Sequence, residues 1–258
     1  LGVLGFSCSE SDFDKYPSDK VTEGGFFAGN ENVRQMLNDG YASLRLVVQV
    51  HFQLSDLPSD DTYNSKFNNS LNHITLNEGT WDSNNGSIAL YWQHCYTVIS
   101  RAHMAMEKAE EVMQEGALKT RYINEAKYMR ALMYFNLVRA FGDVPLVLKD
   151  IRNPSELFEY GREPKANVYQ QIIADLKDAS SLPLKYTENT DIGLVTGAAA
   201  KALLGEVYLT MGDAASAKTV LGELVNANAG YKLMDNYADV FAASKSNNDE
   251  IVFAVQYA

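Results

Sequence analysis

Apolar residues recur at helical spacing in several long segments, and this pattern limits the chain to a mainly helical fold. In residues 30–53 the stripe consists of Val33, Met36, Leu37, Tyr41, Leu44 and Val48. Segments of the same kind cover residues 87–113, 120–141, 167–182, 195–211 and 213–226. Gly142 stands where a C-cap glycine belongs, and Pro145 prevents the preceding helix from continuing. Only the final run from Glu250, with the sequence EIVFAVQY, is typical of a strand.

The last two helical segments carry a repeat signature. Leu204-Gly205, Tyr208, Ala217 and Leu221 follow the spacing of a tetratricopeptide unit. The small residues predict that two antiparallel helices approach closely, with Tyr208 and Ala217 buried between them, and Asp213 is placed to cap the second helix. We expect the earlier segments, 87–113 with 120–141 and 167–182 with 195–211, to pair in the same manner.

The charge of the chain restricts its partners. It carries 22 Lys and Arg against 33 Asp and Glu, a formal net charge of −11 over 258 residues. This balance argues against nucleic acid as the main partner and against adhesion to anionic lipid by charge alone. No run of about 18 apolar residues exists to span a membrane as a helix.

Residues 55–86 interrupt the helical pattern and form the candidate ligand site. About thirty residues rich in Asp, Asn, Ser and Thr lack helical periodicity, which is typical of a functional loop. An aromatic face with amide and carboxylate side chains suits a sugar, because ring C–H groups stack on the aromatic while hydroxyls take hydrogen bonds. The expected ligand-binding residues are Asp60, Asp61, Tyr63, Trp81, Asn84 and Asn85. Alternatively, Trp81 packs under its own loop; Trp92, on a helical stripe, is expected in the core.

The sequence contains few of the motifs that are typical of enzymes. The four His form no H-E-x-x-H pair, two Cys cannot build a zinc cluster, and the nucleophile-elbow and phosphate-loop motifs are absent. Asp60 and Asp61 could act as an acid–base pair, but adjacent residues of an extended chain point to opposite sides. Arg130 and Arg139 are too far around their helix to form one cluster, so we expect salt bridges. We therefore expect no catalysis and no cofactor.

The first residues suggest an attachment point. The apolar run LGVLGFS before Cys8 resembles the end of a signal peptide with a lipobox, in which the Cys becomes lipidated. We expect residues 1–8 to be this signal-peptide end, 9–29 a polar tether and 30–258 the helical domain. Alternatively, the segment is a disordered tail with an incidental Cys. Cys95 lies in a helical run and is expected to be an inert buried thiol, so a disulfide with Cys8 is not expected.

Several segments together resemble the SusD/RagB family. The run EAKYMRALMYFNLVRAFGDVPL, from Glu125 to Leu146, is similar to that family's signature helix, with Tyr128 and Met129 as conservative departures. Further similarities lie at Trp92–Ile99, Val168–Ala179, Thr196–Ala200 with Tyr208, and Asn248–Phe253. The resemblance covers nearly the whole chain and implies the N-terminal part of a longer protein, with its C-terminal part missing.

This resemblance implies a mainly α fold of tetratricopeptide-like helix pairs in a superhelical scaffold with long loops. It implies a lipid-anchored protein on the outer face of the outer membrane of Bacteroidetes-type bacteria. Such a protein binds oligosaccharides or other nutrients and works with a SusC-like TonB-dependent transporter. The alternative is a tetratricopeptide-type adaptor that binds a protein and no sugar. A glycoside hydrolase would need two carboxylates about 5–10 Å apart in a cleft, which the sequence does not indicate.

Overall fold

The computed structural model describes residues 29–64, 70–187 and 191–257 and confirms a mainly helical fold. The helices are α2 (Asn30–Ser55), α3 (Leu71–Glu78), α4 (Gly86–Val112), α5 (Ala117–Phe141), α6 (Lys165–Ala179), α7 (Gly197–Thr210), α8 (Ala214–Asn226) and the short α9 (Tyr237–Val240). Two 3₁₀ turns, η2 (Pro154–Glu159) and η4 (Ala243–Lys245), complete the described elements. None of these helices is long and apolar enough to cross a bilayer.

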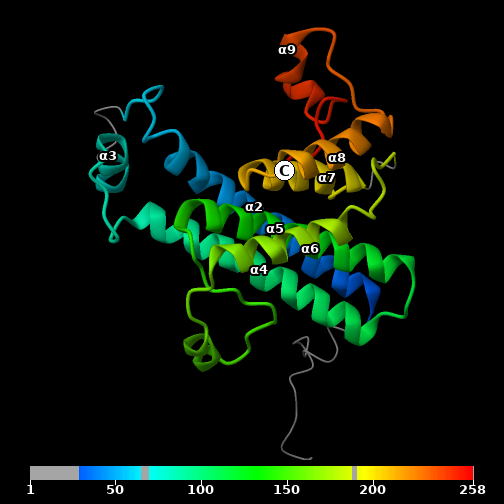
Figure 1. Cartoon of the computed structure of the whole chain (residues 1–258), viewed down its shortest axis with the longest axis horizontal. Coiled ribbons are helices and arrows are strands. Elements are labelled where there is room, and N and C mark those ends of the chain that lie inside the picture. Colours follow the sequence, from blue (N-terminus) through cyan, green and yellow to red (C-terminus); the bar gives the residue numbers. More distant parts are fainter. Residues whose placement is uncertain (1–28, 65–69, 188–190, 258) are drawn as a thin grey trace, which may run out of the picture.

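The long helices pack against their neighbours in the sequence (Figure 1). Helix α2 lies along α4, α4 along α5, and α5 along α6, while α7 and α8 form a further pair that meets α6 over a smaller contact. The pairing of α4 with α5 is therefore as expected, whereas α6 with α7 is the weakest of these junctions. Side chains of α2 and of α4 to α8 form one large core, and Val33, Ala109 and Met113 form a smaller separate cluster.

Helix α5 is the centre of this body, and its polar side chains join it to the helices around it. The buried Glu125 accepts hydrogen bonds from Arg34 Nη1 (2.8 Å) and Tyr41 Oη (2.9 Å) of α2 and from Arg121 Nε (3.0 Å). The hydroxyl of Tyr134 donates to the carbonyl of Val147 at 2.6 Å. The bonds from Arg34 and Tyr41 fix the register of α2 against α5, and the Tyr134 bond holds the segment that follows α5. All of them give buried polar groups a partner.

The expected salt bridges of the two arginines are present. Arg130 is paired with Asp175 of α6 at 2.7 Å, and Arg139 with Glu206 of α7 at 3.1 Å. The end of α5 is also as expected, because Gly142 closes the helix with φ 71°, a conformation that residues with a side chain rarely adopt.

The close approach of the two helices that the tetratricopeptide signature predicts is confirmed at Gly205. A Cβ at Gly205 would overlap the side chain of Leu221, so α7 and α8 can lie this close only because residue 205 has no side chain. Ala217 is buried, and Asp213 caps α8 by accepting from the Ser216 amide at 3.0 Å. Tyr208 is only half-buried, so its expected burial holds in part.

Two sequence-based expectations are wrong. Residues 71–78 form helix α3 inside the segment expected to lack helices. Residues 250–257 form no strand; in the described residues, bridge pairing is limited to Val144 with Glu163. A strand needs a neighbouring strand, and this segment instead lies along α2, where Arg45 Nε donates to the Gln256 carbonyl at 2.7 Å.

Candidate functional site

The polar loop projects from one end of the body, where α2 ends and α4 begins (Figure 1). Helix α3 is its internal support and carries two asparagines, Asn72 and Asn77, that tie the surrounding chain together. The sequence signal for α3 is the glycine that follows it, since Gly79 ends the helix with φ 68°. Sequence reasoning missed α3 because the helix has only eight residues and lies in a segment rich in Asp, Asn, Ser and Thr.

Asn77 holds the segment that carries Tyr63. Its Nδ2 donates to the carbonyls of Leu57 (3.0 Å) and Thr62 (3.1 Å), and its Oδ1 accepts from the amide of Asn64 (3.2 Å). Three bonds from one side chain therefore fix the backbone on both sides of Tyr63. The Tyr63 side chain itself is 75% exposed.

Asn72 and Asn85 attach α3 to the start of α4. Asn85 is the N-cap of α4: its Oδ1 accepts from the amides of Ser87 and Ile88, at 3.0 and 3.2 Å. Its Nδ2 donates to the Asn72 carbonyl (2.9 Å) and to Thr75 Oγ1 (3.0 Å). With four bonds its amide is fully used, and the residue is buried. Asn85 therefore supports the loop and offers no group to a ligand.

Trp81 lies between these two attachments, in the turn that leads into α4. The next residues are fixed locally, because Asp82 Oδ1 accepts from the Asn84 amide at 2.8 Å. Trp81 keeps 46% of its surface exposed, so the ring neither packs fully under its loop nor stands free of it. An exposed aromatic surface on a hydrogen-bonded frame is suited to stacking on a ligand ring.

The charges of this surface are acidic. Asp60 and Asp61 are exposed on a turn in which Ser59 Oγ donates to the Asp56 carbonyl at 2.6 Å. The sequence of residues 55–86 contains five Asp and Glu against one Lys, so the loop has a net negative charge that disfavours an anionic ligand. Carboxylates and the exposed Asn84 amide are suited to neutral polyols, whose hydroxyls donate to the former and bond either way with the latter.

The site residues therefore fall into two groups. The structure places Asp60, Asp61 and Tyr63 on one segment and Trp81 and Asn84 on another, both fixed to α3 and all exposed. Asn85 differs from these five residues, because it is buried and caps α4. No cluster of three His, Cys, Asp or Glu able to hold a metal occurs in the described residues.

Cys95 is buried with no exposed surface, and burial raises the pKa of its thiol to about 12, which fits the expected inert thiol. Cys8 and the tether 9–29, apart from Gly29, lie outside the described residues.

Trp92 is half-buried and packs against the core, with its ring edge-on to Phe141 at 5.0 Å.

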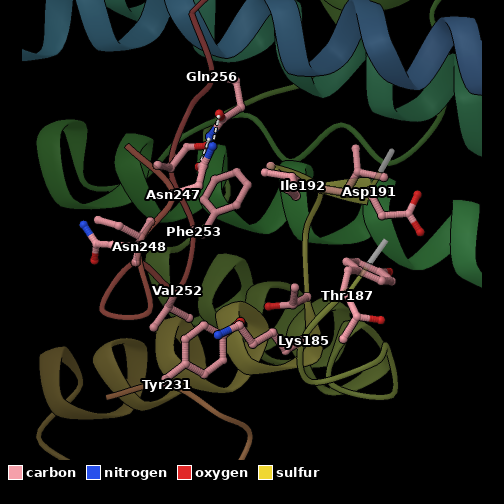
Figure 2. Close-up of a pocket in the computed structure, with 16 residues that line it drawn as sticks. Lys185, Thr187, Asp191, Ile192, Tyr231, Asn247, Asn248, Val252, Phe253 and Gln256 are labelled. Carbon is pink, nitrogen blue, oxygen red and sulfur yellow. Dashed lines mark hydrogen bonds between the residues drawn. The ribbon is translucent and has the colours of Figure 1, made fainter. Parts of the chain in front are cut away.

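A concave region, which the sequence did not indicate, lies between the segment before α7 and the C-terminal segment (Figure 2). It has a volume of about 220 Å³. Lys185 Nζ bonds the Asp249 carboxylate at 2.8 Å and lies over the Tyr231 ring, while Asn247 and Gln256 exchange amide bonds at 3.2 Å. These charged and amide groups are thus engaged with one another, whereas the buried Tyr186 hydroxyl of the lining has no partner in the described residues. The volume is below that of typical ligand pockets. We interpret it as the contact that holds the C-terminal segment in place.

Comparison with known proteins identifies relatives along most of the chain. Residues 14–209 match the model of a SusD-like family described as "Starch-binding associating with outer membrane". The chain is 26% identical over 262 aligned residues to SusD-like protein P2 of Formosa agariphila, an alignment that covers 96% of this chain and 50% of that protein.

Solved structures show the same fold. A SusD superfamily protein from Bacteroides vulgatus superposes with a TM-score of 0.78 at 25% identity, over 88% of this chain and 50% of that one. A protein described as a laminarin binding SusD-like protein superposes with a TM-score of 0.72 at 29% identity, over 84% of this chain and 50% of its own. The chain therefore spans about half the length of the relatives it matches.

Proposed function

The chain belongs to the SusD-like family of glycan-binding proteins associated with the outer membrane, and from this premise we propose that the polar loop between α2 and α4 is its glycan-binding surface. The protein captures neutral oligosaccharides there for uptake by a SusC-like TonB-dependent transporter.

One observation carries the proposal. Trp81 and Tyr63 expose 46% and 75% of their surfaces, although hydrogen bonds of Asn72, Asn77 and Asn85 fix the backbone on which they stand. A rigid frame lowers the entropic cost of binding, because the aromatic rings are already close to their bound positions. Asp60, Asp61 and Asn84 then supply hydrogen-bonding groups for sugar hydroxyls. Asn85 contributes only indirectly, because its side chain holds α3 against the start of α4.

The chemistry of the relatives supports a neutral glucan as ligand. The family description names starch, and a similar solved structure is described as laminarin binding. Both are neutral polymers of glucose, whose hydroxyls can donate to the aspartates of the loop. We propose that Asp60 and Asp61 bind sugar hydroxyls and do no acid–base work, so the protein is not an enzyme.

The scaffold and the N-terminus complete the proposal. Stacked helix pairs give a long rigid surface suited to docking on a large partner, here the transporter barrel. A lipid on Cys8 and the tether 9–29 would hold the helical domain 30–258 near the membrane, facing the cell exterior. Several acyl chains hold a protein firmly, whereas one chain holds it weakly.

A direct binding measurement tests this function. Isothermal titration of the full chain with maltoheptaose, an α-linked glucan, and laminariheptaose, a β-linked one, should give saturable binding of at least one. The alternative function, a tetratricopeptide-type adaptor, predicts no binding of either oligosaccharide or of a wider glycan panel. That result would overturn the proposal.

A further inference from the structure

A wide groove runs along α4 on the side that faces the segment 145–160. Its volume is about 650 Å³, which lies within the range of small-molecule sites. Helix α4 forms one wall, and Pro145, Ile151 and Leu157 contribute to the other. The segment 145–160 leaves the helical body as an extended loop beside α4 and α6 (Figure 1).

The α4 wall carries an aromatic surface held in place by its neighbours. The rings of Trp92 and Tyr96 lie 5.0 Å apart at 45°, and both side chains are half-buried. Trp92 is supported edge-on by Phe141, and the Tyr96 hydroxyl donates to the Pro145 carbonyl at 2.7 Å. This surface is therefore rigid before any ligand arrives, as a stacking site requires.

A line of polar side chains runs beside the aromatic one. Gln93, Thr97 and Ser100 follow at spacings of four and three residues, so they form one stripe along α4, and all three line the groove. Thr97 Oγ1 donates to the Gln93 carbonyl at 2.9 Å and keeps its lone pairs for another donor. The groove thus offers stacking surface and hydrogen-bonding groups together.

His103 has a buried nitrogen atom in this groove without a hydrogen-bond partner among the described residues. It lines the groove and is 2% exposed, yet its Nε2 has no hydrogen-bond partner in the described structure. A buried polar atom left without a partner is destabilising, so such an atom calls for an explanation. Because Nε2 is shielded from solvent in this structure, a ligand hydroxyl in the groove would supply the missing partner only once the imidazole turns toward it.

The charges around the groove are neutralised. Arg101 is paired with Asp39 at 2.7 Å, and Lys149 with Glu156 at 2.5 Å. Burial lowers the pKa of His103 to about 3, with a further contribution from the charge of Arg130, so the imidazole is neutral at physiological pH. A groove with balanced charge favours a neutral ligand over an anion or a cation.

We propose that this groove is a second glycan subsite, in which neutral sugar rings stack on Trp92 and Tyr96 and a hydroxyl bonds His103 Nε2. The inference rests on the proposed glycan-binding function and adds a site outside the polar loop. Its ligand is a neutral oligosaccharide, bound through ring faces on one side and hydroxyls on the other.

The chain allows a site-specific test because it contains only two tryptophans. In Trp81→Phe, Trp92 is the sole tryptophan, and its fluorescence reports on the groove alone. Titration with maltoheptaose or laminariheptaose should change Trp92 emission saturably. Adding Ser100→Phe, which fills the groove with a ring, should weaken this response by about tenfold or more, while Ser155→Phe, the same change at an exposed position outside the groove, should leave it intact.

The outcomes separate the two proposals. If the native chain binds an oligosaccharide by calorimetry but Trp92 emission does not respond, the groove is not a subsite and the proposed function stands. If Trp92 emission responds to sugar equally in the Ser100→Phe variant, the proposal that the groove is a glycan subsite is also wrong. A Trp92 response to dodecanoate and to neither sugar would show an apolar ligand and overturn the assignment to glycans. If calorimetry of the native chain shows no binding, the proposed function itself fails.

Discussion

Arg130 of α5 and Asp175 of α6 form a two-pronged ion pair inside the protein, with Nε to Oδ2 at 2.8 Å and Nη2 to Oδ1 at 2.7 Å. The Asp175 side chain is 2% exposed and that of Arg130 is 8% exposed. Gln171 Nε2 adds a third bond to Asp175 Oδ1 at 2.9 Å. The pair joins the two helices at the centre of the fold.

Breaking this pair should destabilise the protein strongly. Asp175→Asn leaves a buried guanidinium without its counter-charge, and we expect a loss of about 3–5 kcal/mol in the free energy of unfolding by urea. The double variant Arg130→Met/Asp175→Leu should be more stable than Asp175→Asn, since no charge is then left buried. As a control, Glu223→Gln, in the more exposed pair with Lys201, should cost about 1 kcal/mol or less.

The α7–α8 contact gives a test of the tetratricopeptide unit. Ala217 is 1% exposed, so Ala217→Leu adds atoms where no space exists and should cost about 1–3 kcal/mol. Ala215, on the same helix, is exposed, and Ala215→Leu should leave the melting temperature nearly unchanged. Equal melting temperatures for the two variants would contradict the close packing of these helices.

His103 predicts a dependence of stability on pH. Because burial holds the pKa of His103 in the folded protein near 3, below the value of about 6.5 in the unfolded chain, the unfolded state binds a proton that the folded state does not. Stability should therefore fall as the pH drops from about 6.5 toward 3, by up to about 1.4 kcal/mol per pH unit from this group.

The variant His103→Gln removes this titration and should flatten the decline in melting temperature between pH 6.5 and 4. His94→Gln, a change of the same chemistry on the same helix, is the control for the substitution itself. A native slope in His103→Gln would show that other groups cause the acid sensitivity.

The N-terminal anchor predicts a change of location. If Cys8 carries a lipid, Cys8→Ser should move the protein from the membrane fraction to the supernatant of the expressing cells. Mass spectrometry of the native protein should then find acyl chains on Cys8. Unchanged fractionation together with an unmodified Cys8 would rule the anchor out.

The successes and failures of the sequence predictions have a common physical reason. The ends and contacts of helices depend on local signals, so Gly142, Asp213 and the Gly205–Leu221 approach could be predicted from short patterns. The strand at 250–257 could not be judged in this way, because strands need a partner from elsewhere in the chain. This segment contacts α2, where Arg45 donates a hydrogen bond to the Gln256 carbonyl, and pairs with no strand in the described residues.

In the candidate site, too, local composition was informative, whereas contacts with distant residues could not be predicted. The composition of residues 55–86 identified the exposed Trp81, Tyr63 and Asn84, but it could not separate Asn84 from Asn85, which differ only in what surrounds them. The groove along α4 was hidden for a similar reason. Trp92 belongs to the α4 stripe and Leu157 to a distant segment, so only the fold brings them together.

The most direct test of the glycan-binding loop is to measure binding and stability on one variant. Trp81→Ala removes an aromatic contact and should weaken oligosaccharide affinity by about 1–3 kcal/mol, measured by calorimetry, while the melting temperature stays nearly unchanged. Tyr237→Ala, which removes another exposed aromatic far along the chain, should change neither quantity. A Trp81→Ala protein that melts early and binds with native affinity when folded would contradict the assignment of this loop as the glycan-binding surface.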